Sequence, residues 1–195
     1  MDEKQIKEIY KEFATPLHVA RHCRAVADFA VELGKGLIAA GEKIDLDLVR
    51  AAALLHDFVR VVDFRSFNPE KFPDPISGED IEILKRLREK YKGRHHCDAG
   101  AEILAEKGFA DIANVVKKHK FLQIEEGFET WEEKLVYYAD KRVKHHSVVT
   151  LRERLDDGRK RNAADMAGRE ESHKLDEKVF ALEKEIMTRI GKFRM

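Results

Sequence analysis

Apolar side chains recur every three or four positions along most of the chain, which is the spacing of one face of an α-helix. A short first helix contains Ile6 and Phe13, and we expect Thr15-Pro16 to supply the N-cap and first-turn proline of the helix that follows. The apolar positions of that second helix are Val19, Cys23, Val26, Ala30, Leu33 and Leu37. Both helices are predicted to bury one face.

A third predicted helix begins near Asp45 or Asp47 and is apolar on most sides, so it should lie at the centre of the fold. Its apolar positions are Leu48, Ala52, Leu55 and Val59. Further helices are predicted over residues 80–91, 98–107, 110–121 and 131–145, and Gly108 fits a C-terminal stop. No segment alternates between apolar and polar residues and is flanked by hairpin turns, so we expect no β-sheet. The predicted fold class is all-α.

Three of the predicted helix starts resemble capping boxes, in which two side chains satisfy backbone N–H groups reciprocally. The pairs are Ser77 with Asp80, Thr130 with Glu133, and Thr150 with Glu153. Residues 63–78 hold three of the four prolines and form the one long loop that we expect. Loops of this length often act as lids over functional sites.

The chain becomes strongly charged from Leu151 onward and keeps only a thin apolar stripe. The stripe consists of Leu175, Val179, Leu182, Ile186 and Ile190. Such a helix could pack on the rest of the chain or form the contact between two copies in a homodimer. We therefore divide the chain into a main domain, residues 1–150, and a charged C-terminal helical extension, residues 151–195, which we expect to pack on the same domain.

Composition narrows the classes of partner. Charged residues make up 38% of the chain, but the 37 basic residues balance the 37 acidic ones, so we expect no nucleic acid polymer and no membrane as partner. The longest stretch without Asp, Glu, Lys or Arg, residues 13–20, is also far too short to span a bilayer. The acidic start of the chain lacks the apolar core of a signal peptide, which favours a cytoplasmic location.

Several groups that are costly to bury occupy positions predicted to face the core. The doublet His56-Asp57 directly follows the apolar run 51–55, His22 flanks the stripe of the second helix, and Asp140 lies on an apolar helical face. A carboxylate or an imidazole in such a place needs a compensating partner. A bound metal ion would satisfy all four side chains together.

The same residues carry a resemblance to a known family. Their order is His22, then His56-Asp57 within Ala-Leu-Leu-His-Asp, then Asp140 within Tyr-Ala-Asp-Lys. This order resembles the metal signature of the HD-domain superfamily of metal-dependent phosphohydrolases. The resemblance covers residues 15–145. It implies a compact HD-domain bundle of helices, which agrees with the helical periodicity.

Two further histidines extend the resemblance, because family members with two metals place such a pair between the doublet and the last aspartate. His96 stands four residues before Gly100, and His119 continues the stripe of its predicted helix. The resemblance then implies one or two divalent ions per chain, held by His22, His56, Asp57, His96, His119 and Asp140, with Asp57 as the bridging catalytic carboxylate. Such donors favour iron or manganese, and zinc, nickel, cobalt or magnesium are also compatible. His95 competes with His96 for the same role.

Three residues near the expected ligands could bind the phosphate of a substrate. Arg60 lies one turn beyond the doublet, on a helix that we expect to continue, so its guanidinium would face the ligands. Lys141 adjoins one predicted ligand, and His18 precedes another by four residues. The alternatives are a solvated cation for Arg60 and a surface or core position for His18.

Two features near the predicted ligands have simpler interpretations. Cys23 and Cys97 each follow a predicted ligand, and because helix neighbours diverge by about 100°, we expect both to be free thiols that act as small buried hydrophobes. After the doublet, Phe58-Val59 replaces the Ile-Gly that is common in the family. These larger side chains either narrow the entrance of the site or repack its surroundings.

The favoured function is hydrolysis of a phosphate ester, a nucleotide or another small phosphate, by a metal-bound hydroxide. This chemistry needs no protein nucleophile, in agreement with the lack of a Gly-x-Ser-x-Gly motif and of a phosphate-binding glycine loop. Two alternatives stay open. Some HD-fold proteins with the same ligand order hold two irons and cleave carbon bonds with O₂, and a non-catalytic metal or nucleotide sensor could share the fold.

Overall fold

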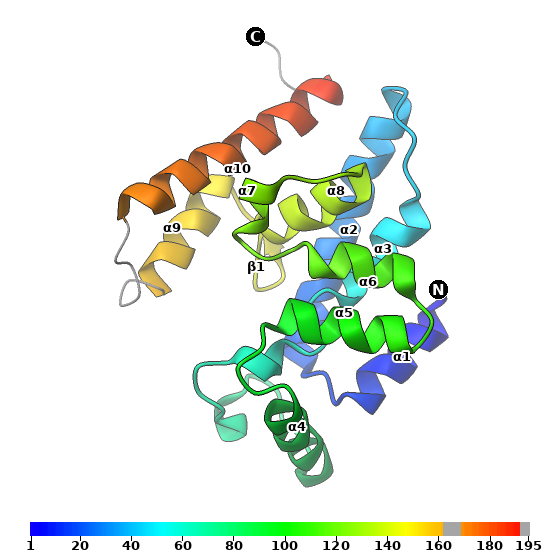
Figure 1. Cartoon of the computed structure of the whole chain (residues 1–195), viewed down its shortest axis with the longest axis vertical. Helices are drawn as coiled ribbons and strands as arrows, with labels where there is room; N and C mark the ends of the chain where they lie inside the picture. Colours follow the sequence, from blue (N-terminus) through cyan, green and yellow to red (C-terminus); the bar gives the residue numbers. More distant parts are fainter. Residues whose placement is uncertain (162–168, 192–195) are drawn as a thin grey trace.

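The computed structural model describes residues 1–161 and 169–191, and helices dominate it (Figure 1). The α-helices are α1 (Glu3–Glu12), α2 (Leu17–Ala39), α3 (Leu46–Leu55), α4 (Gly78–Lys90), α5 (His96–Glu106), α6 (Ala110–Lys117), α7 (Gln123–Glu126), α8 (Trp131–Asp140), α9 (Leu151–Arg161) and α10 (Arg169–Arg189). Two 3₁₀ helices, η1 (Arg60–Asp63) and η2 (Pro69–Lys71), follow α3, and two strands, β1 (Val143–Lys144) and β2 (Ser147–Val148), follow α8. The predicted all-α class is confirmed.

Helix α3 lies at the centre of the bundle, as its apolar sequence predicts. It packs against α1, α2, α6 and α8, and every residue from Ala51 to Leu55 is buried. Helix α5 packs alongside α6, and α4 lies at the periphery, where it contacts η1 (Figure 1). Helices α2 and α3 approach closely because Gly34 has no side chain: a Cβ atom there would lie 2.6 Å from Leu46 Cδ2.

The end of α3 positions the His-Asp doublet. The helix ends at Leu55, and the predicted continuation through Val59 is wrong: His56 is the C-cap, and the chain turns through residues 57–59 into η1. The Tyr10 hydroxyl donates a hydrogen bond to the carbonyl of Leu54, which the end of the helix would otherwise leave without a partner. The doublet therefore lies where the backbone turns, and not on a regular helical face.

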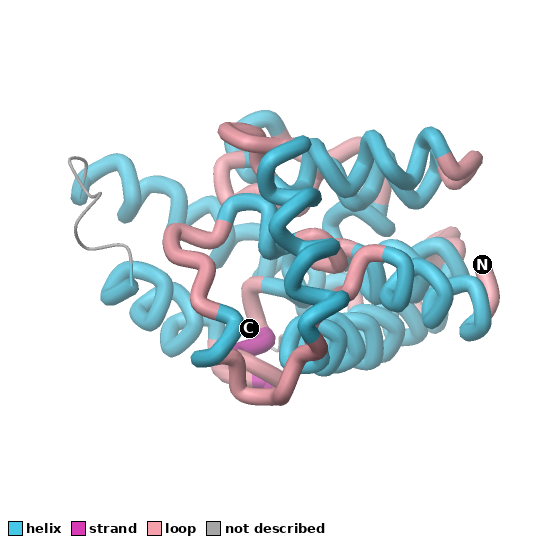
Figure 2. Tube along the Cα trace, turned by 90° about the horizontal axis from the view of Figure 1, so that it is seen from below, coloured by secondary structure: helices cyan, strands magenta, loops and turns pink. Residues whose placement is uncertain are grey.

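Strands β1 and β2 form a small antiparallel hairpin, so the prediction of no β-sheet is wrong for these four residues. Strands of two residues are too short to show an alternating pattern, and His145 in their turn adopts the left-handed φ of 57°. Figure 2 shows the hairpin among helices and loops. Because the hairpin follows it, helix α8 ends at Asp140 and not at the predicted residue 145. Helix α6 also ends earlier than predicted, at Lys117 and not at residue 121.

The three predicted N-caps form, but only Thr150 with Glu153 makes the reciprocal capping box, in which Glu153 accepts from the backbone N–H of Thr150. Asp80 instead accepts from the Ser77 hydroxyl, and Glu133 from the backbone N–H of Glu129. The side chains of Ser77, Thr130 and Thr150 each accept a hydrogen bond from the backbone N–H three residues later. Gly108 follows α5 with a left-handed φ of 85°. Helix α2 differs by one residue, because Pro16 is its N-cap and the Thr15 hydroxyl donates to the carbonyl of Phe58.

The C-terminal helices pack on the body of the chain. Helix α10 contacts α2, α7 and α8, and Leu175, Val179, Leu182 and Ile186 are buried. These residues of the stripe therefore contact the same chain, whereas a homodimer and the division into domain and extension stay predictions. Residues 162–168 and 192–195 of the predicted extension lie outside the described residues.

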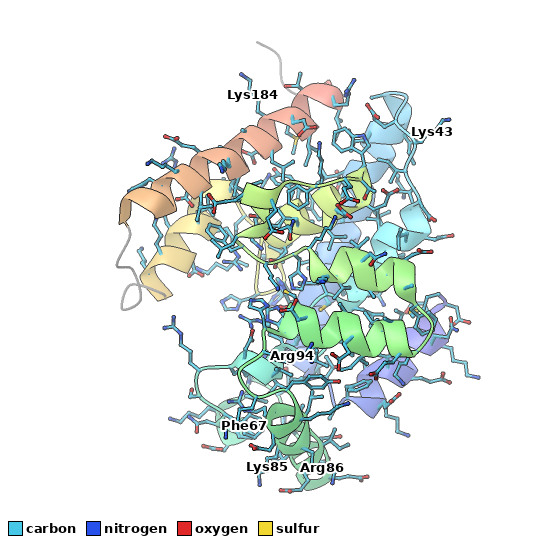
Figure 3. All side chains as sticks on the ribbon, viewed as in Figure 1. Lys43, Phe67, Lys85, Arg86, Arg94 and Lys184 are labelled. Carbon is cyan, nitrogen blue, oxygen red and sulfur yellow. The ribbon has the colours of Figure 1, made fainter. Side chains whose placement is uncertain are left out.

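Charged side chains cover the outside of the molecule. Lys43, Lys85 and Lys184 are exposed and lie at the periphery on three separate parts of the chain (Figure 3). Among the described helices, none is both long enough and apolar enough to cross a membrane.

Candidate metal centre

Six side chains from five parts of the fold meet in one cluster. His22 belongs to α2, His56 and Asp57 to the end of α3, His96 to α5, His119 to the turn after α6, and Asp140 to α8. Four of them, His56, His96, His119 and Asp140, are buried. The structure thus brings together all six residues that the resemblance implies as ligands.

His22, His56 and Asp140 form the first group. Oδ1 of Asp140 lies 3.1 Å from Nε2 of His22 and 3.7 Å from Nε2 of His56. The two imidazole rings are 5.3 Å apart between centroids. These three donor atoms lie within 4.8 Å of one another, which is close enough for one ion.

Asp57, His96 and His119 form the second group. Oδ1 of Asp57 lies 2.9 Å from Nε2 of His96 and 3.4 Å from Nε2 of His119. Its other oxygen, Oδ2, lies 3.7 Å from Nε2 of His56 in the first group. The carboxylate of Asp57 therefore faces both groups.

Each of the four imidazoles is held through Nδ1, which turns Nε2 toward the carboxylates. In three of them Nδ1 faces a backbone carbonyl oxygen. The distances are 2.9 Å from His22 to His145, 2.7 Å from His56 to Ala53, and 2.5 Å from His119 to Val116. In His96, Nδ1 lies 2.7 Å from Oδ2 of Asp63. The three carbonyl oxygens favour the proton on Nδ1 of His22, His56 and His119, which places the lone pair of each neutral ring on Nε2. This arrangement is typical of metal-bound histidines. Nδ1 of His96 lies against both the Asp63 carboxylate and, at 2.8 Å, the donor Nη1 of Arg60.

Two further observations show that the cluster fits a cation. Nε2 of His56 is buried and has no hydrogen-bond partner among the described residues, which costs free energy unless another group binds it. Nε2 of His96 and Nε2 of His119 face each other at 3.0 Å, and both lie near Oδ1 of Asp57. A divalent metal ion would satisfy these nitrogens and the carboxylates together.

At three of the six side chains, Asp57, Asp140 and His119, the electrostatics favour the charge states that a metal requires. Burial alone would lower the pKa of His56, but Cys23 and Asp57 beside it raise that pKa well above its usual value. Burial alone would raise the pKa of Asp57, but the imidazoles of His56 and His96 hold it well below its usual range. Burial would likewise raise the pKa of Asp140, but the Lys141 ammonium and two imidazoles hold it well below its usual range. Burial lowers the pKa of His119 to about 3. At neutral pH these two carboxylates are therefore ionised and His119 is neutral, as binding of a metal ion would require.

Arg60 reaches the cluster by a different route from the predicted one, because α3 does not continue past the doublet. Its Nε atom lies 3.8 Å from Oδ2 of Asp57, and its guanidinium forms an ion pair with Asp63. Asp63, at the end of η1, is a residue that the sequence analysis missed. It also accepts a hydrogen bond from the backbone N–H of His96, in addition to the contact with Nδ1. An acid that follows two buried valines was the available signal.

The other two predicted substrate contacts lie beside the ligands without joining them. The Lys141 ammonium is buried and lies 2.5 Å from Oδ2 of Asp140 and 3.3 Å from the carbonyl oxygen of His119. The His18 ring packs edge-on against Phe72 of the 63–78 segment, with 5.2 Å between centroids. Its Nδ1 atom is buried and has no hydrogen-bond partner among the described residues.

The two neighbouring histidines at the start of α5 have different positions. His95 is the N-cap, and its Nδ1 accepts a hydrogen bond from the backbone N–H of Cys97 at 3.3 Å. Its side chain is 42% exposed, whereas that of His96 is 6% exposed and faces Asp57. The geometry therefore favours His96 over His95 as a ligand.

Cys97 departs from the expectation that its side chain points away from the site. Its Sγ atom is buried and lies 3.2 Å from Nε2 of His119 and 3.5 Å from Nε2 of His96. The first turn of α5 abuts the cluster, so both His96 and Cys97 reach it. Cys23 is a buried free thiol, as predicted.

The Phe58-Val59 pair repacks the core instead of lining an entrance. Both side chains are buried, and Phe58 packs edge-on against Phe13 with 5.3 Å between ring centroids. Gly100 of α5 makes room for them: a Cβ atom there would lie 3.1 Å from Phe58 and 3.4 Å from Val59.

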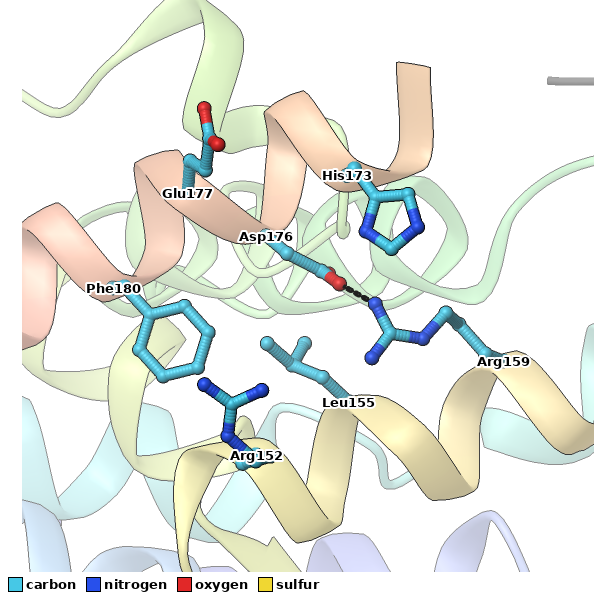
Figure 4. Close-up of a pocket in the computed structure, with 7 residues that line it drawn as sticks. All are labelled: Arg152, Leu155, Arg159, His173, Asp176, Glu177 and Phe180. Atoms are coloured by element: carbon cyan, nitrogen blue, oxygen red, sulfur yellow. Dashed lines mark hydrogen bonds and ion pairs between the residues drawn. The ribbon is translucent and has the colours of Figure 1, made fainter. Parts of the chain in front are cut away.

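A pocket of about 320 Å³ lies between α9 and α10, where Arg159 pairs with Asp176 (Figure 4). Its lining residues are Arg152, Leu155, Arg159, His173, Asp176, Glu177 and Phe180. None of them is a predicted ligand or substrate contact. The pocket is therefore separate from the metal centre.

Comparisons with known proteins agree with this site. An uncharacterized protein of Methanocaldococcus jannaschii, MJ0778, is 30% identical over 137 residues, and the match covers 63% of this chain and 64% of that protein. The chain thus spans a little under two thirds of the curated relative that it matches. No solved structure matches significantly. The HD domain matches residues 19–152, a segment that contains all six clustered side chains. The chain belongs to the HD domain family.

Proposed function

We propose that this chain hydrolyses the phosphate ester of a small molecule, a nucleotide or a compound of similar size, at the His and Asp cluster. The observation that carries the proposal is the common orientation of four imidazoles, each anchored at Nδ1 with Nε2 directed at the carboxylates. The HD domain family, whose members are in general metal-dependent phosphohydrolases, supports the reaction class.

In this proposal two divalent ions bind between the groups. His22, His56 and Asp140 hold the first, and His96 and His119 hold the second. Asp57 serves both, which is supported by the way its two oxygens face His56 on one side and His96 and His119 on the other. The ions would supply a Lewis acid that activates water and neutralises charge on the phosphoryl oxygens. Imidazole and carboxylate donors suit iron or manganese, and zinc, nickel, cobalt and magnesium are compatible.

Other side chains would bind the substrate and orient the ligands. Arg60 lies within reach of Asp57 and is 37% exposed, so its guanidinium is available to a phosphate. Lys141 holds Asp140 and would thus orient a ligand. The 63–78 segment contacts α2 through Phe72 with His18 and through Asp74 with Arg21. These contacts support a lid role, with His18 near the bound substrate.

The test is phosphate release by full-length protein loaded with manganese under anaerobic conditions, in water labelled with ¹⁸O. We expect turnover of nucleotides or other small phosphate esters, with solvent oxygen in the released phosphate, and loss of both metal and activity in Asp57→Asn. Activity that requires O₂ and cleaves a carbon bond would instead support the di-iron oxygenase alternative. Metal binding without turnover of any phosphate ester would support a sensor.

A further inference from the structure

We infer that Cys97 is an additional ligand, which gives the second metal position a thiolate donor and a preference for thiophilic ions. The inference rests on the proposed function, because it takes the second ion as given. The six ligands of that proposal provide only nitrogen and oxygen. A sulfur donor would change which metals this position selects, because thiolates favour zinc, cobalt or iron over magnesium and manganese.

The distances between the donor atoms match those around one ion. The donor atoms are Nε2 of His96, Nε2 of His119, Oδ1 of Asp57 and Sγ of Cys97. Five of their six pairwise separations are 3.0, 2.9, 3.4, 3.5 and 3.2 Å. A tetrahedral ion with bonds of about 2.0 to 2.3 Å places its ligands roughly 3.3 to 3.7 Å apart. The four atoms therefore surround a space that one ion can fill after small adjustments.

The Cys97 thiol can form a hydrogen bond with only one of the two imidazoles that adjoin it. The single S–H proton of Cys97 can be donated to Nε2 of His119 or to Nε2 of His96, but not to both. The Nε2 atom of the other imidazole then receives no proton from the thiol. An ion bound to the thiolate satisfies both nitrogens at once, and the displaced proton passes to solvent.

A second observation, independent of the cysteine, also indicates a ligand here. Nε2 of His56 is buried without a hydrogen-bond partner among the described residues. It belongs to a group of donor atoms with Asp57 and His119, and its ring packs edge-on against that of His119 at 4.9 Å. The buried acceptor thus adjoins the same side chains that surround Cys97.

The experiment is a titration of metal-depleted, full-length protein with cobalt(II), followed by absorption. We expect a thiolate-to-cobalt charge-transfer band in the near ultraviolet that saturates with one of two bound equivalents. The band should disappear in Cys97→Ser and persist in Cys23→Ala, which removes the other cysteine. We also expect Cys97→Ser to lower the affinity of one site for zinc by at least about tenfold and to change manganese affinity less.

Cadmium-113 NMR of the unaltered protein gives a readout that does not depend on the folding of a variant. One of two resonances should have the strong deshielding of a sulfur ligand. Two resonances that both indicate only nitrogen and oxygen donors would overturn the role of Cys97, as would a charge-transfer band that survives in Cys97→Ser. Failure of the cluster to bind cobalt or cadmium at all would instead overturn the proposed metal centre.

Discussion

Asp63 accepts hydrogen bonds from both the backbone N–H and Nδ1 of His96, so it fixes the ring whose Nε2 faces Asp57. Burial alone would raise the pKa of Asp63, but the bonds from His96 lower it to about 2, so the carboxylate is ionised at neutral pH. An ionised acceptor keeps the proton on Nδ1 and raises the basicity of Nε2. In the proposed metal centre, Asp63 would therefore position His96 for the second ion.

We expect Asp63→Asn to weaken binding of the second ion by about tenfold to a hundredfold and to leave the first ion in place. The reason is that an amide is a weaker acceptor and can present its NH₂ group to Nδ1. Calorimetric titration of metal-depleted protein would measure both sites. Asp74→Asn, in the same segment but paired with Arg21, is the matched control and should bind both ions normally. Equal affinities in Asp63→Asn and the control would contradict the role.

Arg60→Ala should keep its metals and lower kcat/KM for the phosphate substrate by roughly tenfold to a hundredfold. A guanidinium that reaches a phosphate makes charge-assisted hydrogen bonds worth about 1.5 to 3 kcal/mol each. Arg60→Lys should recover part of the rate, because it restores the charge without the planar fork. Arg94→Ala, an exposed arginine paired with Glu102, is the control. Unchanged kcat/KM in metal-loaded Arg60→Ala would support a solvated arginine.

The residue types and their order predict much of this site, and the local backbone decides the rest. His22, His56, Asp57 and Asp140 could be identified because each combines a costly group with an apolar setting. Asp63 has only a weak signal, an acid after two valines, because the chain reaches it through a turn and η1 that leave no periodic pattern. Cys97 could not be identified. Neighbouring side chains on a helix usually point in different directions, but α5 begins at the cluster, so both His96 and Cys97 reach it.

At the scale of elements, the packing of α5 against the segment after α3 depends on Gly100. A Cβ atom at this position would lie 3.1 Å from Phe58, 3.4 Å from Val59 and 3.6 Å from Val116, and these neighbours are themselves buried. The missing side chain therefore lets α5 bring His96 close to the doublet. The spacing of His96 and Gly100 along the sequence thus has a structural reason.

We expect Gly100→Ala to reduce the free energy of unfolding by about 1 kcal/mol. The strain of an extra methyl group in a packed core, about 1 to 3 kcal/mol, outweighs the gain in helix propensity of about 1 kcal/mol. Urea denaturation would measure the change. Gly78→Ala, in the first turn of α4 with no atom within 4 Å of the added methyl, should be neutral or slightly stabilising. Equal stability of both variants would contradict the packing argument.

Helix existence follows from sequence periodicity, whereas helix ends follow from contacts that the sequence does not reveal. The apolar run of α3 continues to Val59, yet the helix ends at Leu55, where Tyr10 from α1 satisfies a free carbonyl. The β1–β2 turn likewise carries the His145 carbonyl to Nδ1 of His22. The early end of α3 and the β1–β2 turn both lie next to the cluster. The apolar periodicity of the sequence is therefore least informative where the histidines of the cluster are oriented.

Across the whole molecule, the cluster joins segments that are far apart in the sequence. Its six side chains come from α2, the end of α3, α5, the turn after α6, and α8, so ions bound there would link most of the core. The all-α class could be predicted from periodicity alone, because nearly every segment follows it. The convergence of these five segments could be expected only from the resemblance, since no local pattern fixes how helices meet.

Removal of the metals should therefore destabilise the entire fold. An ion that binds only the folded state at a hundred times its dissociation constant adds about 2.7 kcal/mol of stability. For a chain of this size each kcal/mol shifts Tm by about 2 to 4 °C, so chelation should lower Tm by roughly 5 to 10 °C. Calorimetry of protein before and after chelation, with metal content verified by elemental analysis, measures this shift. Re-addition of manganese or zinc should restore Tm, which separates metal loss from irreversible damage.

His22→Ala, which removes a proposed ligand of the first ion, should show a smaller response to chelation than the unaltered protein. An unchanged Tm in protein shown to have lost its metals would mean that the ions do not link these segments.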